Sequence, residues 1–236
     1  MRIRRFGIAG AVLAVTIAVA ALASSASASP VFFGKAAVGS TVAPVKFTGT
    51  LGAAFLEAKA GTKITCTAGT STGEVTGPTT GKNGVTKFTG CETSGVECHN
   101  AAANEIDTKV LAGTLGNVSA TLPGIRLFDE KEGRGGILAE FTCAGGAVKV
   151  QVRGSVIGSL SGASGKTVEE GKLATSSKLT FAEKEGIQKY VKFVPGEGEA
   201  GEEQLEGNTG AGFEKSGQSV IATLKTTPAG QLGVTK

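Results

Sequence analysis

The sequence predicts an all-β protein, an antiparallel sandwich or barrel of about ten short strands that is stapled by two disulfides. Three observations predict it. Apolar and polar residues alternate with period two along most of the chain, 37 glycines supply frequent turns in a chain without tryptophan, and the four cysteines are even in number. Helical periodicity is confined to two short stretches, Ala53–Ala60 and Thr167–Ala174.

The strand prediction is clearest where valines alternate with polar residues. From Val148 to Val152 every second residue is valine, which places these side chains on one face of a strand. A second strand is predicted over Ile187–Val194, ended by the turn pair Pro195–Gly196. Further strands are predicted at Val45–Leu51, Lys63–Ala68, Val85–Cys91, Ile106–Leu115, Gly136–Cys143, Lys178–Ala182 and Val220–Lys225.

Asn83 and Gly84 predict a hairpin turn between Thr79–Thr80 and the strand that begins at Val85. Both residue types adopt positive φ readily, as a type I′ turn requires at its two central positions. The chain is therefore expected to reverse its direction at this point.

The N-terminus predicts a cleavable signal peptide over residues 1–28. Arginines in the first five residues precede an apolar run from Phe6 to Ala23, and Ala26 and Ala28 form a small-residue cleavage signal. The run is slightly short for a membrane span and is not followed by stop-transfer charges. We expect cleavage after Ala28, secretion or attachment to the cell wall, and no stable membrane span afterwards.

Residues 29–236 are predicted to form a single β-rich extracellular domain, because 208 residues suit one large all-β unit. Within it, residues 196–212 are rich in glycine and glutamate and nearly free of large apolar residues. This segment is interpreted as an exposed acidic loop.

Net charge argues against nucleic acid as a partner. Three of the positive charges behind the formal +4 are Arg2, Arg4 and Arg5, so the mature chain carries only about +1. No stripe of lysine and arginine remains in it. The expected partner is an envelope or extracellular molecule of unknown identity.

Four cysteines in an exported chain favour two disulfides. The pairing predicted is Cys91 with Cys98, which closes a short local loop, and Cys66 with Cys143, which both end apparent strands. Two other connectivities are possible. A zinc site made of cysteines and His99 is the alternative, although no CxxC pair is present.

One pattern resembles a catalytic serine motif. Gly69, Ser71 and Gly73 match the GxSxG nucleophile elbow, which needs a helix after the serine and a histidine base. Pro78 prevents a useful helix, and the only histidine, His99, has no acid at suitable spacing. The motif is interpreted as a Thr- and Gly-rich turn.

Two further patterns resemble nucleotide-binding loops. Gly165–Thr167 resembles the end of a phosphate loop, but Leu160 stands where its first glycine belongs. Gly196–Gly201 matches GxGxxG, but carboxylates surround it where a pyrophosphate would lie. Both are interpreted as loops, and weak calcium binding is the alternative for the acidic residues, which are Glu197, Glu199, Glu202, Glu203 and Glu206.

Several stretches resemble exported proteins of high-GC Gram-positive bacteria that carry no assigned function. The resemblance implies an extracellular compartment and a β fold, and it brings no active site. It is carried by the Arg-rich signal peptide and by Ile64–Cys66, Gly90–Cys91 with Cys98, Ile137–Cys143, Val152–Gly158 and Thr226–Gly230.

The sequence therefore favours a secreted or cell-envelope protein of structural or adhesive type, with no catalytic, cofactor-binding or metal-binding residues predicted. One alternative is a secreted hydrolase with a carboxylate pair drawn from residues such as Asp107, Asp129 and Glu140. Another is a carrier of a small ligand, which predicts an enclosed apolar pocket inside a barrel.

Overall fold

The computed structural model describes residues 29–34, 44–162, 164, 173–195, 200–228 and 232–235. The expected signal peptide lies outside this part. Among the described residues there are 22 strands and one short 3-10 turn, η1 (Ala144–Gly146), so the all-β prediction is confirmed. None of this helical structure has the length or apolarity needed to cross a bilayer.

Alternation in the sequence becomes alternation of burial in the strands. In β13 (Val148–Gly162), Val150 and Val152 are buried, whereas Lys149 is exposed. In β2 (Val45–Leu51), Leu51 is buried and the lysine and threonines between the inward positions are exposed. Each such strand therefore has one face for the interior and one for solvent.

Eight strands close into a first ring. Every strand pairs antiparallel with the next one in this order along the chain, and the last pairs with the first. The members are β2, β5 (Ala68–Val75), β6 (Thr80–Thr89), β10 (Leu111–Ser119), β11 (Leu122–Asp129), β13, β15 (Ser177–Phe181) and β21 (Phe213–Thr227). The sheet is thus a barrel whose opposing walls face one apolar interior, as the layers of a sandwich do.

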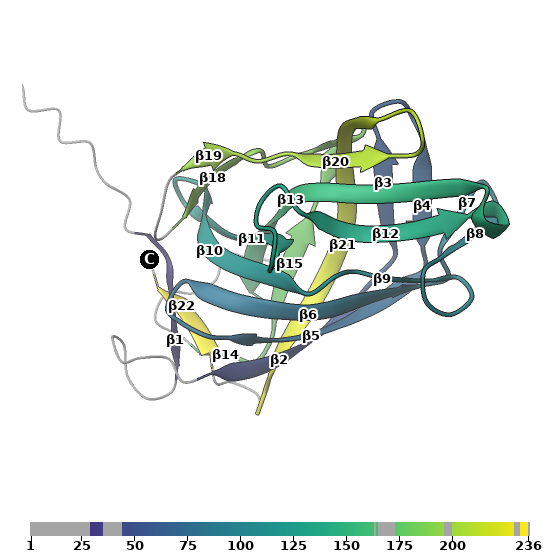
Figure 1. Cartoon of the computed structure of the whole chain (residues 1–236). Helices are drawn as coiled ribbons and strands as arrows, with labels where there is room; N and C mark the ends of the chain where they lie inside the picture. The colour runs from purple at the N-terminus through teal and green to yellow at the C-terminus, as the bar shows by residue number, and fades with distance from the viewer. Residues whose placement is uncertain are drawn as a thin grey trace, which may run out of the picture.

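A second ring of eight strands lies end to end with the first. It also closes through antiparallel pairs. The members are β3 (Ala54–Ala58), β4 (Lys63–Cys66), β7 (Glu92–Thr93), β8 (Val96–His99), β12 (Ile137–Cys143), β13, β20 (Leu205–Asn208) and β21. β13 and β21 belong to both rings, and Figure 1 shows β21 running from the β3 and β20 side to the β2 side.

The prediction of about ten strands is wrong in number, because the main sheet has 17. Its remaining members are β9 (Glu105–Asp107), β18 (Lys192–Pro195) and β19 (Gly201–Glu202). Unlike β13 and β21, some stretches are interrupted where they pass from one ring to the other, as at Gly90, whose φ of 62° bends the chain between β6 and β7. Such interruptions divide one long stretch into two strands.

Two other sequence interpretations of secondary structure are wrong. The helical periodicity at Ala53–Ala60 belongs to β3, which pairs with β4 and β21. The single strand expected over Ile187–Val194 is two strands, β17 (Ile187–Gln188) and β18. β17 pairs with β16 (Glu183–Lys184) in a separate two-stranded sheet, whereas β18 pairs with β10 in the barrel wall.

A three-stranded sheet packs against one end of the first ring (Figure 1). It consists of β1 (Val31–Gly34), β22 (Leu232–Thr235) and β14 (Leu173–Ala174). Phe32 and Val234 from this sheet form an apolar cluster with Leu115 and Leu160 of the barrel. The backbone N–H of Phe32 also donates a 2.6 Å hydrogen bond to the carbonyl of Pro78.

Two disulfides are present, as predicted, but the predicted pairing is wrong: Cys66 bonds to Cys91, and Cys98 bonds to Cys143. The four cysteines lie in a row across neighbouring chain segments of the second ring, in the order of their numbers. A bond between the two central cysteines would leave Cys66 and Cys143 about three strand spacings apart, on the order of 14 Å, which exceeds the reach of a disulfide.

Candidate functional site

The barrel interior contains an apolar cavity of about 200 Å³. Inward-facing side chains of the first ring form most of its wall, and residues of the second ring such as Leu205 extend it. Alternate residues of β21, among them Val220 and Ala222, point into it because a strand turns every second side chain to the same face. The cavity is therefore an apolar space in the barrel interior.

The three-stranded sheet contributes to the wall at one end of the cavity. Phe32, Leu232 and Val234 all line it. An apolar cavity of about 150 Å³ holds benzene, so this one suits a molecule of roughly eight to ten non-hydrogen atoms.

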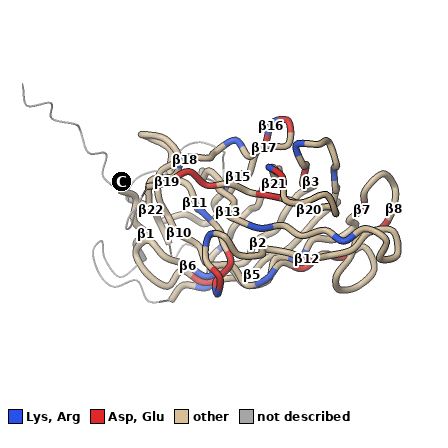
Figure 2. The backbone as a smooth tube through the Cα atoms, turned by 45° about the horizontal axis from the view of Figure 1, so that its top comes forward, with Lys and Arg blue, Asp and Glu red and all other residues tan. Residues whose placement is uncertain are grey.

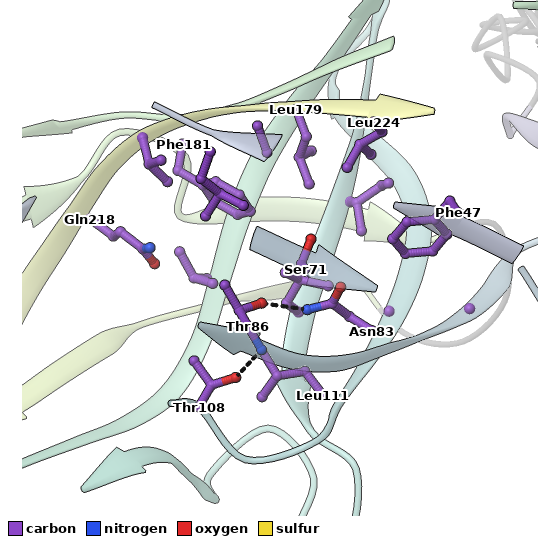
Figure 3. Close-up of a pocket in the computed structure, with 18 of the residues that line it drawn as sticks. Phe47, Ser71, Asn83, Thr86, Thr108, Leu111, Leu179, Phe181, Gln218 and Leu224 are labelled. Atoms are coloured by element: carbon purple, nitrogen blue, oxygen red, sulfur yellow. Dashed lines mark hydrogen bonds between the residues drawn. The ribbon is translucent and has the colours of Figure 1, made fainter. Parts of the chain in front are cut away.

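Three of the uncharged polar side chains in the wall are buried. Ser71 comes from β5, and Asn83 and Thr86 come from β6; each is only 7% exposed and lines the cavity. The Asn83 amide donates a 2.8 Å hydrogen bond to the Thr86 hydroxyl. Figure 3 shows this pair beside Ser71, with Phe47 and Leu224 nearby.

Two oxygens of this group have no hydrogen-bond partner among the described residues: Ser71 Oγ and the amide oxygen Asn83 Oδ1. Neither oxygen is among the fully buried side-chain atoms that lack a partner, so each borders the open space of the cavity. Gly49 lies opposite Ser71 in the register, and a Cβ at this position would clash with Ser71 Oγ. The missing side chain at Gly49 therefore makes room for the hydroxyl.

The expected hairpin at Asn83 and Gly84 is wrong. Both residues lie inside β6, which continues from Thr80 to Thr89 and contains a bulge opposite β5. A Cβ at Gly84 would lie 2.9 Å from the Thr72 carbonyl, so glycine is needed for a close approach of two backbones. Asn83 consequently faces the interior.

The turn expected at the GxSxG pattern is also wrong, because Gly69, Ser71 and Gly73 lie within β5. The glycines stand where neighbouring backbone or ring atoms approach closely. The signal that could identify Ser71 as an interior residue is the period-two pattern that it shares with Gly69, which is also buried; the resemblance to a catalytic motif obscured this pattern.

A second polar group is buried on the outer face of the barrel. Glu203, which is 4% exposed, accepts hydrogen bonds from Ser155 of β13 at 2.5 Å and from Arg126 of β11 at 2.7 Å. Arg134 donates to the same carboxylate at 3.1 Å, and the Gln188 amide donates to the Glu203 carbonyl at 2.8 Å. Figure 2 shows the acidic stretch around β19 beside β11.

The pKa of Glu203 is lowered by these contacts. Burial opposes ionisation of the carboxyl, but the Ser155 hydrogen bond, the positive charge of Arg126 and the hydrogen bonds of both arginines outweigh it. Every strong donor around the carboxylate comes from the protein itself. The group therefore holds the segment that follows β19 against the barrel, and it leaves Arg126 Nε and the Gln188 amide oxygen buried without a hydrogen-bond partner among the described residues.

The acidic loop expected over residues 196–212 is wrong for the part that the structure describes. Leu205 is buried, and β19 and β20 both lie within this interval. Glu206 binds Arg153 at 2.7 Å, and Glu203 binds two arginines, so these two carboxylates are engaged by cations of the protein. Residues 196–199 lie outside the described part.

The structure places the other candidate carboxylates in separate contacts. Asp129 caps a turn by accepting bonds from the backbone of Lys131 and Glu132, Glu140 accepts a bond from Gln151, and Asp107 is paired with Lys87. His99, on β8, hydrogen-bonds Glu97 at 2.8 Å. Among the described residues no three histidine, cysteine or acidic side chains gather as a metal site would require.

The cavity is thus a concave feature of the described barrel in which polar atoms without protein partners meet an apolar wall. Comparison of the chain with models of protein families, with curated proteins and with solved structures gives no match in any of the three.

Proposed function

We propose that the protein is an exported carrier of a small lipophilic molecule, which it holds inside the barrel. The observation that carries the proposal is the apolar cavity of about 200 Å³ at the centre of a closed ring of strands. Eight-stranded barrels are of the size at which the interior either fills with side chains or holds one small ligand. The space left here favours the second case.

An extracellular location is part of the proposal. Two disulfides and the absence of a membrane-spanning helix among the described residues are compatible with it. The structural or adhesive role and the hydrolase alternative stay predictions, and no grouping of described side chains supports either of them more strongly than the cavity supports binding.

Calorimetric titration with propylbenzene tests the proposal, because this hydrocarbon fits the cavity and makes no hydrogen bonds. We expect a dissociation constant in roughly the micromolar range. Ala222→Phe fills the cavity from β21 and should abolish binding. Ile221→Phe is the matched control, because Ile221 is the adjacent residue and is 51% exposed.

Thermal unfolding of both variants checks that each is folded. Saturable binding to the wild type and to Ile221→Phe, with none to a folded Ala222→Phe, supports the carrier function. Absence of binding to the wild type by every small apolar compound tried would contradict it.

A further inference from the structure

The donors and acceptors of the cavity wall are not balanced. Among the described residues, Ser71 Oγ makes no hydrogen bond, and Asn83 uses its amide N–H but not its oxygen. Thr108 is fully engaged, since its hydroxyl donates to the Lys109 carbonyl and accepts from the Thr86 N–H. Among the buried polar side chains of the wall, what remains is one hydroxyl, which can donate or accept, beside one oxygen that can only accept.

Both atoms lie on the same side of the cavity. Ser71 is paired in register with Thr86, whose hydroxyl accepts the Asn83 amide hydrogen. Figure 3 shows Ser71 and Asn83 close together with their oxygens directed into the space beneath Leu179 and Leu224. One small group on a ligand can therefore contact both.

The surroundings favour an uncharged group. No aspartate or glutamate occurs among the described lining residues, and the two lysines there are not buried against the polar pair. Lys82 is bound to Glu130 at 2.7 Å, and Lys225 is exposed. A charged group in this position would lose its hydration without gaining a buried counter-charge.

Within the proposed carrier function, we infer that the ligand carries one uncharged hydroxyl, which donates a hydrogen bond to Asn83 Oδ1 and accepts one from Ser71 Oγ, while its apolar body fills the remaining cavity. The chemical class is a small phenol or alcohol. The inference depends on the proposed function. It specifies that the cavity prefers a ligand with a hydroxyl group to an apolar ligand or a charged ligand of the same size.

Three probes of matched size test this class: 4-ethylphenol, propylbenzene and benzoate. Each is titrated calorimetrically into the full mature chain at neutral pH. We expect 4-ethylphenol to bind about tenfold tighter than propylbenzene, which corresponds to the contribution of one or two buried hydrogen bonds. Benzoate should bind more weakly than both.

Ser71→Ala removes one of the two contacts and leaves the cavity slightly larger. It should weaken 4-ethylphenol binding about fivefold and leave propylbenzene binding unchanged or slightly tighter. Thr70→Ala is the matched control, because Thr70 is the preceding residue of β5 and is exposed. This control should change neither affinity.

The outcomes separate the two proposals. If none of the three probes binds, the carrier function itself fails. If propylbenzene binds as tightly as 4-ethylphenol, or if Ser71→Ala weakens both equally, the cavity binds apolar molecules but the inference about the hydroxyl is wrong, and water alone satisfies the polar pair. Preferential binding of benzoate would also overturn it.

Discussion

The Ser155 hydroxyl donates a 2.5 Å hydrogen bond to the Glu203 carboxylate, which lies 48 residues later in the chain. Ser155 stands on the outer face of β13, and Glu203 follows β19, so the bond attaches a covering segment to the barrel wall. Arg126 of β11 binds the same carboxylate and lies over the ring of Phe193 at 4.8 Å. This buried group is the basis of the first two predictions.

Glu203→Gln should destabilise the protein by about 3 kcal/mol, because it leaves the buried guanidinium of Arg126 without its counter-charge. Urea denaturation measures the free energy of unfolding. Glu202→Gln is the control, since Glu202 is the neighbouring residue and is exposed, and it should change stability by less than about 0.5 kcal/mol. Equal effects of the two substitutions would contradict the role given to Glu203.

The stability difference between the wild type and Glu203→Gln should depend on pH. The pKa of Glu203 is lowered in the folded state, so its stabilisation is complete above its unfolded pKa of about 4.3 and disappears as pH falls through the lower folded value. Urea denaturation of both proteins from neutral pH to below pH 4 checks this. A difference that stays constant, or grows, as pH falls would show that the carboxylate charge is not responsible.

Non-reducing peptide mapping should recover Cys66 joined to Cys91 and Cys98 joined to Cys143. The bridges span 25 and 45 residues, so in the chain-entropy model each contributes about 3 to 4 kcal/mol. Replacing Cys98 and Cys143 together by alanine should lower the free energy of unfolding by about this amount. Recovery of a Cys91 to Cys98 peptide from the native protein would contradict this pairing.

Gly49→Ala should destabilise the barrel by about 1 to 3 kcal/mol, because the new methyl group clashes with Ser71 Oγ and lies 3.1 Å from a Leu224 methyl carbon. Adding Ser71→Ala removes the first clash, so the double variant should lose less stability than the two single variants added together. A double-mutant cycle measured by urea denaturation gives the coupling. Simple additivity would mean that the two positions do not meet.

The strands of this protein could largely be predicted from local pattern, and the sites could not. The alternating valines of Val148–Val152 predict which side chains face inward without any knowledge of the neighbouring strands. Asn83–Gly84 has the composition of a turn, and only the approach of β5 shows that the glycine permits a bulge and that the asparagine is interior. The polar pair in the cavity is therefore a property of pairing between strands.

The disulfide pairing is also determined by the way the strands pair and not by local sequence. Local spacing favours Cys91 with Cys98, and these two residues are indeed neighbours, since the Cys98 N–H donates to the Cys91 carbonyl. Cys66 and Cys143 lie on either side of them, and this arrangement determines the bonds. Likewise, the local sequence around Glu203 predicts a solvated acidic stretch. Its burial depends on Arg126 and Ser155, which are distant in sequence and bind its carboxylate.

The two strands common to both rings, β13 and β21, couple the closure of one ring to that of the other. A fragment that stops before β13 keeps neither circle of hydrogen bonds, and one that lacks β21 leaves exposed edges at both ends of the molecule. Truncation or proteolytic nicking in either strand is therefore expected to open both rings together and to leave strand edges free to pair with other chains.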